Sequence, residues 1–408
     1  MIFIPIVIII LILFFRIQKG MFAALLILVG VKSLLDAFWN IRIGPLSFAS
    51  FGGVLIPVIF FPVLKHRKKF PKLVRDNAKI LLIAMSLGLL FALPLEPIRT
   101  LELFVINFNI YLSFFLIPAL VDSHKKLKLF LTALMIGGVF PILVSLFQFR
   151  TGIIFYERET VGITRYVGFY HDAFTVRFYG FMTLFSCLLY LSIFKVRKKM
   201  ITVLVYTLML GAFFSIYLVF SKAAVGLIGL WSVLLLLFSK SRVKQLFAMA
   251  IGISIVFVVF GDVFFDNIEQ MFSKEIGYQE GKVTDSRYTL AGRGYVWEDH
   301  WNFWANEQPL FFQWFGDGIS RPTHNEFLRV VMVSGIIGLL VLIVYIFRSV
   351  RMVFKINKFL RVYAFMLLGM YFVDCLGLVP GVYYYYNILL WGMIVLFLFT
   401  DIKQKITV

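Results

Sequence analysis

The sequence predicts an all-α integral membrane protein. Hydrophobic residues make up 61% of the chain and the mean hydropathy is +0.93, whereas soluble domains are roughly 45–50% apolar. The apolar runs are continuous rather than alternating, which is typical of transmembrane helices and argues against the strands of a β-barrel. Many of these runs approach the ~20 apolar residues that a helix needs to cross a hydrocarbon layer about 30 Å thick.

Successive apolar runs predict about 12–13 transmembrane helices. The first run is short, but no small-residue cleavage site follows it, so we expect a retained helix rather than a removed signal peptide. Linkers between the runs are short, except for 150–172 and 266–323. The expected spans are Ile2–Phe15, Met21–Phe38, Ile43–Leu64, Ile80–Leu93, Ile98–Val121, Leu129–Phe149, Ala173–Phe194, Met200–Phe220, Ala223–Phe238, Leu246–Phe265, His324–Phe347, Val362–Val379 and Val382–Thr400.

The distribution of basic residues predicts the orientation of this single polytopic domain, residues 1–408. If the spans alternate, the basic clusters share one face, and the positive-inside rule makes that face cytoplasmic. The smaller loop 150–172 and the large loop 266–323 then lie outside. The net charge of +19 is thus a topology signal and an attraction to anionic lipids, and it predicts no nucleic-acid partner. The clusters are Lys65–Lys69, Lys125-Lys126, Lys195–Lys199, Lys240–Lys244, Arg348–Arg361, and Lys403 with Lys405.

Cysteine and histidine usage predicts neither a disulfide framework nor a metal site. Cys187 and Cys375 both fall within expected spans, where packing is their expected role. The five histidines lack ligand spacing, and no CxxC, HExxH, Walker or GxGxxG motif is present. No Asp-x-Asp pair occurs in an outer loop, although metal-assisted handling of a diphosphate normally requires paired carboxylates. We therefore expect no cofactor, and we expect arginine and lysine to bind any phosphate.

Arginines recur in the two loops that are expected to lie outside. Arg165 belongs to the smaller loop, and Arg287, Arg293 and Arg321 belong to the large one. A guanidinium is a permanently charged planar donor that grips phosphate at two points, so several such groups would suit a pyrophosphate headgroup. The alternative is that these arginines reach lipid phosphates or pair with nearby carboxylates such as Glu157, Glu159 and Asp172.

Two further arginines, Arg177 and Arg329, lie inside expected spans. A charge within a span is costly, and such residues usually serve a purpose. Arg177 is therefore a candidate for binding the same phosphate.

The segment from Pro322 to Glu326 predicts the start of a helix. Thr323 is the expected N-cap and Glu326 follows at the capping-box spacing, which makes His324 the first helical residue. The positive end of a helix disfavours imidazolium and attracts anions. A neutral His324 beside an anion site is a suitable general base for a sugar hydroxyl. Alternatively, His324 only ends a loop and bonds water. For Glu326, capping the helix is the favoured role, and catalysis is the alternative.

Aromatic residues in the large loop predict an amphipathic helix from Tyr295 to Trp304. Its apolar stripe consists of Trp297, Trp301 and Trp304. Interfacial anchoring is the favoured role of this stripe, and stacking on sugars is the alternative.

Short motifs follow one another in a fixed order along the chain. In and after the smaller loop they are Arg165 with Gly168, Asp172-Ala173, and Ser221-Lys222-Ala223. From the large loop onward they are Gly292-Arg293 with Trp297, Pro309, Gly316-Asp317-Gly318, His324-Asn325 and Gly335-Ile336-Ile337-Gly338. With the span pattern, this order resembles the bacterial polysaccharide polymerases (Wzy) and O-antigen ligases (WaaL). The motifs cover Arg165 to Gly338, and Lys222 stands where the family commonly has arginine.

The resemblance implies a GT-C-like, metal-independent membrane glycosyltransferase at the periplasmic face of the bacterial inner membrane. As an O-antigen or capsule-type polymerase, it would move a growing glycan from undecaprenyl diphosphate onto a lipid-linked repeat unit. Its partners would be undecaprenyl-diphosphate-linked oligosaccharides and membrane lipids, with a chain-length regulator as a candidate partner.

The resemblance also implies roles for individual residues. Arg165 and Arg293 would clamp the donor diphosphate, and His324 would orient or deprotonate the acceptor hydroxyl; these are the expected catalytic residues. The expected substrate-binding residues, for diphosphate or glycan, are Lys222, Arg321, Arg177, Arg287, Glu326 and Asn325.

Other functions remain open at this point. A ligase would perform the same chemistry with a lipid A core acceptor. A flippase for lipid-linked oligosaccharides would also be basic and many-spanned, but such transporters usually show two related halves, and the sequence shows no such repeat. A structural partner of an export complex would not need the arginine and histidine arrangement.

Overall fold

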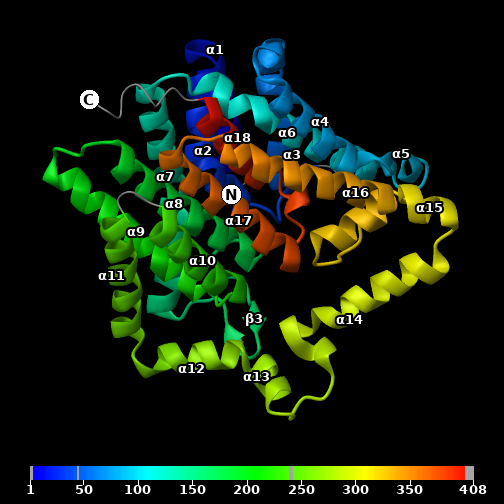
Figure 1. The fold of residues 1–408 in the computed structure, drawn as a ribbon. Coiled ribbons are helices and arrows are strands. Elements are labelled where there is room, and N and C mark those ends of the chain that lie inside the picture. Colours follow the sequence, from blue (N-terminus) through cyan, green and yellow to red (C-terminus); the bar gives the residue numbers. More distant parts are fainter. Residues whose placement is uncertain (1–2, 44–45, 239–241, 400–408) are drawn as a thin grey trace. The chain divides into compact units, whose positions relative to one another are not determined.

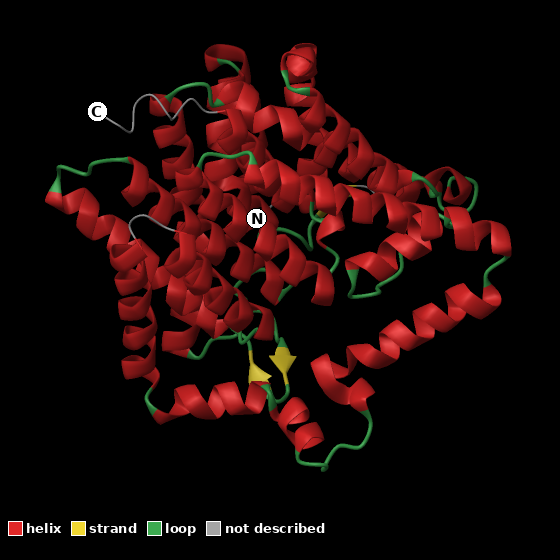
Figure 2. Ribbon diagram, viewed as in Figure 1, coloured by secondary structure: helices red, strands yellow, loops and turns green. Residues whose placement is uncertain are grey.

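The computed structural model describes residues 3–43, 46–238 and 242–399. In these residues the secondary structure is almost entirely helical, which confirms the predicted all-α class, and the strands form only two short hairpins (Figure 2). Contacts divide the chain into two compact units, each of which is described separately.

Unit 1 contains residues up to Gly52 and Leu120–Ser273. Its helix α7 packs against α2, α8 and α9 (Figure 1). The elements of this unit are α1 (Phe3–Lys19), α2 (Met21–Asp36), β1 (Arg42–Ile43), β2 (Leu46–Ser47), α7 (His124–Thr151), β3 (Glu159–Thr160), β4 (Ile163–Thr164), α8 (Ala173–Ile193), α9 (Lys199–Leu218), α10 (Lys222–Phe238), α11 (Arg242–Phe260) and α12 (Asp262–Met271).

Unit 2 contains Gly53–Ala119 and Lys274–Thr400. Its helix α16 packs against α4, α15 and α17. Three helices include residues of both units, namely α3 (Phe48–Phe60), α6 (Pro97–Leu120) and α13 (Ser273–Gln279). The others are the 3₁₀ turn Phe61–Lys69, α4 (Lys72–Ser86), α5 (Leu89–Ala92), α14 (Thr289–Asn302), α15 (Leu310–Phe315), α16 (Glu326–Phe354), α17 (Lys358–Gly377) and α18 (Tyr384–Phe399).

Among the described residues, six helices are long and apolar enough to cross a membrane, namely α6, α7, α8, α9, α16 and α17. A seventh span results if α11 and α12, which are bent by 103° at their junction, count as one. Each expected apolar range overlaps a helix, but Ile80–Leu93 is divided between α4 and α5, and Leu246–Phe265 runs across the bend between α11 and α12. Several of the other helices are short. With 17 and 16 residues, α10 and α18 fall below the ~20 residues that match the bilayer core. The structure thus shows a multi-span helical membrane protein with fewer full-length spans than expected.

Local capping signals define the smaller loop. The helix α7 ends at Thr151 and is capped by Gly152, which has a left-handed φ of 70°. The next helix, α8, begins after Asp172, whose side chain accepts a hydrogen bond of 2.8 Å from the Thr175 N–H. An aspartate N-cap and a glycine C-cap satisfy backbone groups that a helix end leaves open. The loop boundaries therefore agree closely with the predicted 150–172.

The large loop is more structured than a linker. It contains α13, α14 and α15, together with a π-type turn at Phe303–Glu307. The predicted helix is confirmed from Tyr295 to Asn302, where α14 ends and continues directly into that turn, which contains Trp304. The Trp301 and Trp304 rings lie 4.9 Å apart.

The helix α16 is broken at Gly335, and the end of the large loop packs against this break. Gly335 has φ 66° and ψ −171°, a region that only glycine adopts readily. Near the break, the carbonyls of Met332 and Val333 accept hydrogen bonds of 3.2 Å from the N–H groups of Asp317 and Gly318. The Gly-x-Gly motif therefore docks against the broken helix through its backbone.

We predict that Gly335→Ala destabilises the protein by at least ~1–3 kcal/mol, the usual cost of such backbone strain. An added Cβ would also collide with the Trp314 carbonyl oxygen. The matched control is Gly226→Ala in α10, where a Cβ meets nothing and where alanine favours a helix by roughly 0.5–1 kcal/mol. Thermal unfolding of the purified variants measures both effects. Equal melting temperatures for the two variants would contradict this role of Gly335.

Candidate functional site

The start of α16 differs by two residues from the sequence prediction. The helix begins at Glu326, and its N-cap is Asn325, whose Oδ1 accepts a 3.0 Å hydrogen bond from the Leu328 N–H. The predictions of Thr323 as N-cap, of a capping box with Glu326, and of His324 as first helical residue are therefore wrong. Asparagine caps a helix at least as well as threonine, so the later of two capable residues is used. His324 precedes the cap, with a left-handed φ of 49°.

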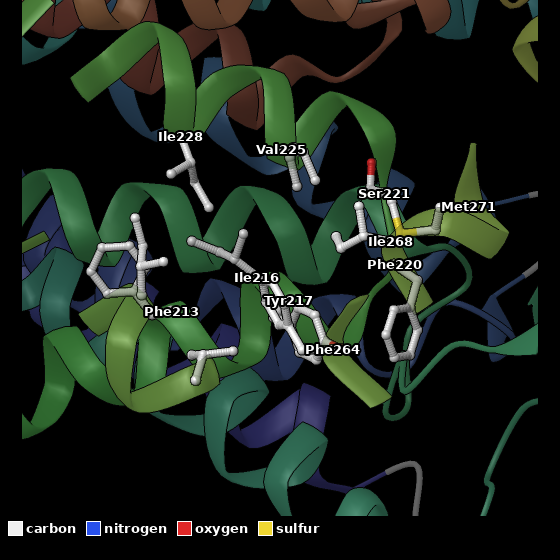
Figure 3. Close-up of a pocket in the computed structure, with 13 residues that line it drawn as sticks. Phe213, Ile216, Tyr217, Phe220, Ser221, Val225, Ile228, Phe264, Ile268 and Met271 are labelled. Carbon is white, nitrogen blue, oxygen red and sulfur yellow. The ribbon is translucent and has the colours of Figure 1, made fainter. Parts of the chain in front are cut away.

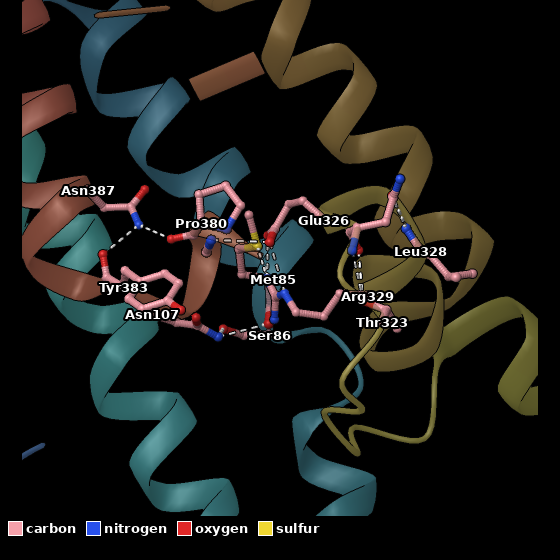
Figure 4. Close-up of polar contacts among 12 residues, drawn as sticks. Met85, Ser86, Asn107, Thr323, Glu326, Leu328, Arg329, Pro380, Tyr383 and Asn387 are labelled. Atoms are coloured by element: carbon pink, nitrogen blue, oxygen red, sulfur yellow. Dashed lines mark hydrogen bonds and ion pairs between the residues drawn. The ribbon is translucent and has the colours of Figure 1, made fainter. Parts of the chain in front are cut away.

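The carboxylate of Glu326 belongs to a buried ion pair. Arg329 Nη2 lies 2.5 Å from Glu326 Oε1 and Arg329 Nε lies 3.2 Å from Oε2, and both side chains are almost completely excluded from solvent. The Gly381 N–H donates a further hydrogen bond of 3.1 Å to Oε2 (Figure 4). This geometry gives Glu326, a residue expected to bind substrate, a structural partner inside the protein.

Polar contacts extend this ion pair to neighbouring helices of unit 2. Arg329 Nη2 contacts the Met85 thioether at 2.8 Å, and Asn107 Nδ2 donates to the Met85 carbonyl at 2.8 Å. Beyond Gly381, Asn387 Nδ2 donates to the Pro380 carbonyl at 2.7 Å (Figure 4). The first turn of α16 is thus held against α4 and the connection between α17 and α18.

His324 lies immediately before this fixed helix start, and its side chain is accessible to solvent. Partial burial of the imidazole lowers the pKa of His324 below its usual value, and the positive charges of Arg293 and His300 lower it further. The predicted neutral imidazole is supported, but the cause is shielding and neighbouring cations rather than a position inside the helix. The structure therefore brings Arg293 and His324, two of the expected catalytic residues, within electrostatic reach of each other.

Arg293 follows an unusual stretch of backbone. Leu290, Ala291 and Gly292 all adopt left-handed conformations, which are strained for residues other than glycine. The guanidinium of Arg293 extends to the end of α17, where a Cβ on Gly377 would lie 2.6 Å from its Nη1. A side chain at position 377 would thus displace the cation.

Three other expected substrate-binding residues have clear intramolecular roles. Arg287 pairs with Asp285 at 2.8 Å and Glu298 at 2.7 Å, and its side-chain hydrogen bonds hold the pKa of Asp285 below the usual range. Arg321 grips Asp317 at two points, 2.6 and 3.1 Å. The third, Asn325, is the helix cap already described. Carboxylates thus offset the charge of both arginines in this structure, and their binding of substrate stays a prediction.

A second group of expected site residues gathers in unit 1. Arg165 follows the β3–β4 hairpin and donates from Nη2 to the Phe220 carbonyl at 3.2 Å. Arg177, buried in α8, donates from Nη1 to the Ser221 hydroxyl at 3.2 Å. Lys222 opens α10 and lies 5.4 Å from the centre of the Phe272 ring. The turn between α9 and α10 therefore collects the cations Arg165, Arg177 and Lys222.

Phe220 gives this turn its shape. It is buried and has a φ of 42°, an outlier for a bulky residue, and it packs in a cluster with Ile163 and Met271. Strain of this kind persists only where surrounding contacts enforce it, and it often marks a functional site. Sequence reasoning noticed Ser221-Lys222-Ala223 but missed Phe220, because its backbone conformation has no sequence signal.

Other contributors were also missed by sequence reasoning. His300 lowers the pKa of His324, and no sequence signal indicated that role. Gly377 and Gly381 gave no signal either, because what matters is the space that they leave for Arg293 and Glu326. Across the residues that the structure describes, no group of three or more His, Cys, Asp or Glu side chains could hold a metal ion.

Neither protein-family models nor curated proteins match the sequence. The class of the protein therefore rests on its own helices, which are those of a multi-span membrane protein.

We predict that Arg293→Gln raises the pKa of His324, because removing a neighbouring positive charge favours imidazolium. The matched control is Arg287→Gln, since carboxylates already offset that charge, and it should leave the value near that of the wild type. Imidazole chemical shifts across a pH titration report the pKa, and with only five histidines the signals are assignable. A wild-type value at or above the usual ~6.5, or equal shifts in both variants, would disprove the proximity of Arg293.

We also predict that Glu326→Gln destabilises the fold by about 3–5 kcal/mol, because it leaves the buried Arg329 charge without its carboxylate. The control is Glu102→Gln, which breaks the more exposed pair with Arg99 and should cost no more than about 1 kcal/mol. Denaturant unfolding in detergent measures the difference. Similar unfolding free energies would show that the buried pair does not support this region.

Proposed function

We propose that the protein is a membrane glycosyltransferase of the polymerase type. It transfers a growing O-antigen or capsule-type glycan from undecaprenyl diphosphate onto a lipid-linked repeat unit at the outer face of the inner membrane. The observation that carries the proposal is an accessible imidazole with a lowered pKa beside Arg293. The resemblance to Wzy and WaaL proteins in the order of their motifs supports it.

The reaction needs a base for the acceptor and cations for the donor. The acceptor hydroxyl attacks the anomeric carbon of the donor sugar, a new glycosidic bond forms, and the bond from that carbon to the diphosphate oxygen breaks. His324, neutral near pH 7, accepts the hydroxyl proton during the attack. The electron pair leaves with undecaprenyl diphosphate, and arginine offsets the charge that develops on it.

Each unit, taken by itself, holds groups of the kind that this chemistry needs. Arg293 supplies positive charge near His324 and favours the unprotonated base, because its charge adds to burial in lowering the pKa of His324. Arg165 is the second candidate for the diphosphate, with Arg177 and Lys222 beside it at the α9–α10 turn. Arginine suits this role because its fork of donors matches phosphate oxygens.

An O-antigen ligase would use the same residues in the same roles, with a lipid A core as acceptor. A flippase would need cations along a path but no base. These alternatives differ in which product accumulates, and a genetic experiment separates them.

We predict that His324→Ala and Arg293→Ala each reduce polymer formation by roughly 10²–10³-fold, the usual loss for a catalytic base or a charge-stabilising donor. His66→Ala and Arg67→Ala, two exposed residues of the Phe61–Lys69 turn, serve as matched controls and should retain full activity. The readout is glycan length in cells that carry each variant, with protein abundance measured in the membrane fraction.

In the inactive variants, single lipid-linked repeats should still appear on the outer leaflet. If the repeats collect on the inner leaflet instead, the protein is a flippase and this proposal is wrong. If free lipid-linked polymer accumulates and is not transferred to lipid A, the protein is a ligase rather than a polymerase.

A further inference from the structure

A cavity of about 160 Å³ lies in unit 1 among α9, α10, α11 and α12. Its walls are almost entirely apolar, with branched and aromatic side chains from each helix, among them Phe213, Ile216, Val225, Ile228 and Ile268 (Figure 3). An engineered apolar cavity of about 150 Å³ stays dry and binds benzene. This cavity can therefore hold an apolar group of similar size, such as one isoprene unit.

Cations gather at one part of the cavity wall. Phe220 and Ser221 both line it, and the same two residues accept hydrogen bonds from Arg165 and Arg177 at 3.2 Å. Lys222 is the next residue along the chain. An apolar cavity beside arginine donors is complementary to a lipid whose hydrocarbon chain begins directly after a phosphate.

The helix α12 closes the cavity from another side. It turns away from α11 by 103° (Figure 1) and contributes Ile268 and Met271 to the cavity wall. Other apolar residues on this short helix, Val263 and Phe265, are 54% and 60% exposed. A helix with this pattern is suited to lie in the membrane interface, which is the depth at which a lipid phosphate meets its chain.

We propose that this cavity binds the phosphate-proximal isoprene unit of a polyprenyl phosphate lipid, with the phosphate at Arg165, Arg177 and Lys222. The inference rests on the proposed function, which it deepens by assigning the lipid part of the donor to unit 1. A cavity of about 160 Å³ takes only the short, methyl-bearing part of such a chain next to the phosphate, and the rest of the chain would lie in the membrane.

The experiment measures lipid binding rather than sugar transfer. The purified full chain is incubated with undecaprenyl phosphate, or with a diacyl phosphatidic acid that carries the same phosphate on straight chains. Native mass spectrometry then counts the lipid retained at each concentration. Wild-type protein should prefer undecaprenyl phosphate.

Variants that fill the cavity test its role. Val225→Trp places a large ring in the cavity from α10, and its control is Val233→Trp on the same helix, which does not line the cavity and is similarly exposed. Ile268→Trp fills the cavity from α12, with Val263→Trp as control, and keeps the test valid if the first variant fails to fold. Each filled variant should bind undecaprenyl phosphate at least roughly tenfold more weakly. The Trp ring keeps the apolar carbons of the lipid out of the cavity, so their transfer from water no longer contributes to binding.

The outcomes separate this inference from the proposed function. Unchanged binding by the folded filled variants would overturn the cavity assignment, even if the wild type makes polymer. Equal retention of phosphatidic acid would overturn the isoprenoid assignment in favour of a general lipid site. Specific undecaprenyl phosphate binding by a wild type that makes no polymer would support the cavity and refute the transferase.

Discussion

The buried pair between Glu326 and Arg329 is the interaction on which the proposed catalytic region depends. Both residues lie in the first turns of an apolar helix, where an unpaired charge would be costly. The pair accepts a third contact from the Gly381 N–H and is packed so tightly that a Cβ on that glycine would approach Arg329 Nη2 to 2.5 Å. His324 lies just before the helix turn that this pair fixes, where it is accessible and within electrostatic reach of Arg293.

The arginines of the chain divide into groups with different partners. Arg287, Arg321 and Arg329 each face a carboxylate at 2.8 Å or less, so their contacts explain loop and helix structure directly. Arg165 and Arg177 instead donate to a carbonyl and a hydroxyl at the edge of an apolar cavity. Arg293 acts on a neighbouring imidazole.

Much of the fold could be predicted from the sequence, because continuous apolar runs and Trp spacing report directly on helices. The helix starts at Glu326 rather than at the predicted His324. Thr323 and Asn325 are both good caps, so the sequence alone does not distinguish between them. The contact of Glu326 with Gly381 joins residues far apart in sequence, and no local pattern predicts it. The strained Phe220 and the turn of α12 depend on tertiary packing in the same way.

The most direct measurement is glycan transfer by the purified chain in lipid nanodiscs that contain only a defined undecaprenyl-diphosphate-linked oligosaccharide and EDTA. Mass spectrometry would quantify both the elongated glycan and the released undecaprenyl diphosphate. If fixed arginines and a neutral imidazole perform the transfer, one lipid diphosphate is released for each repeat joined. Absence of both products from correctly folded protein, or a strict requirement for added divalent metal, would contradict the account.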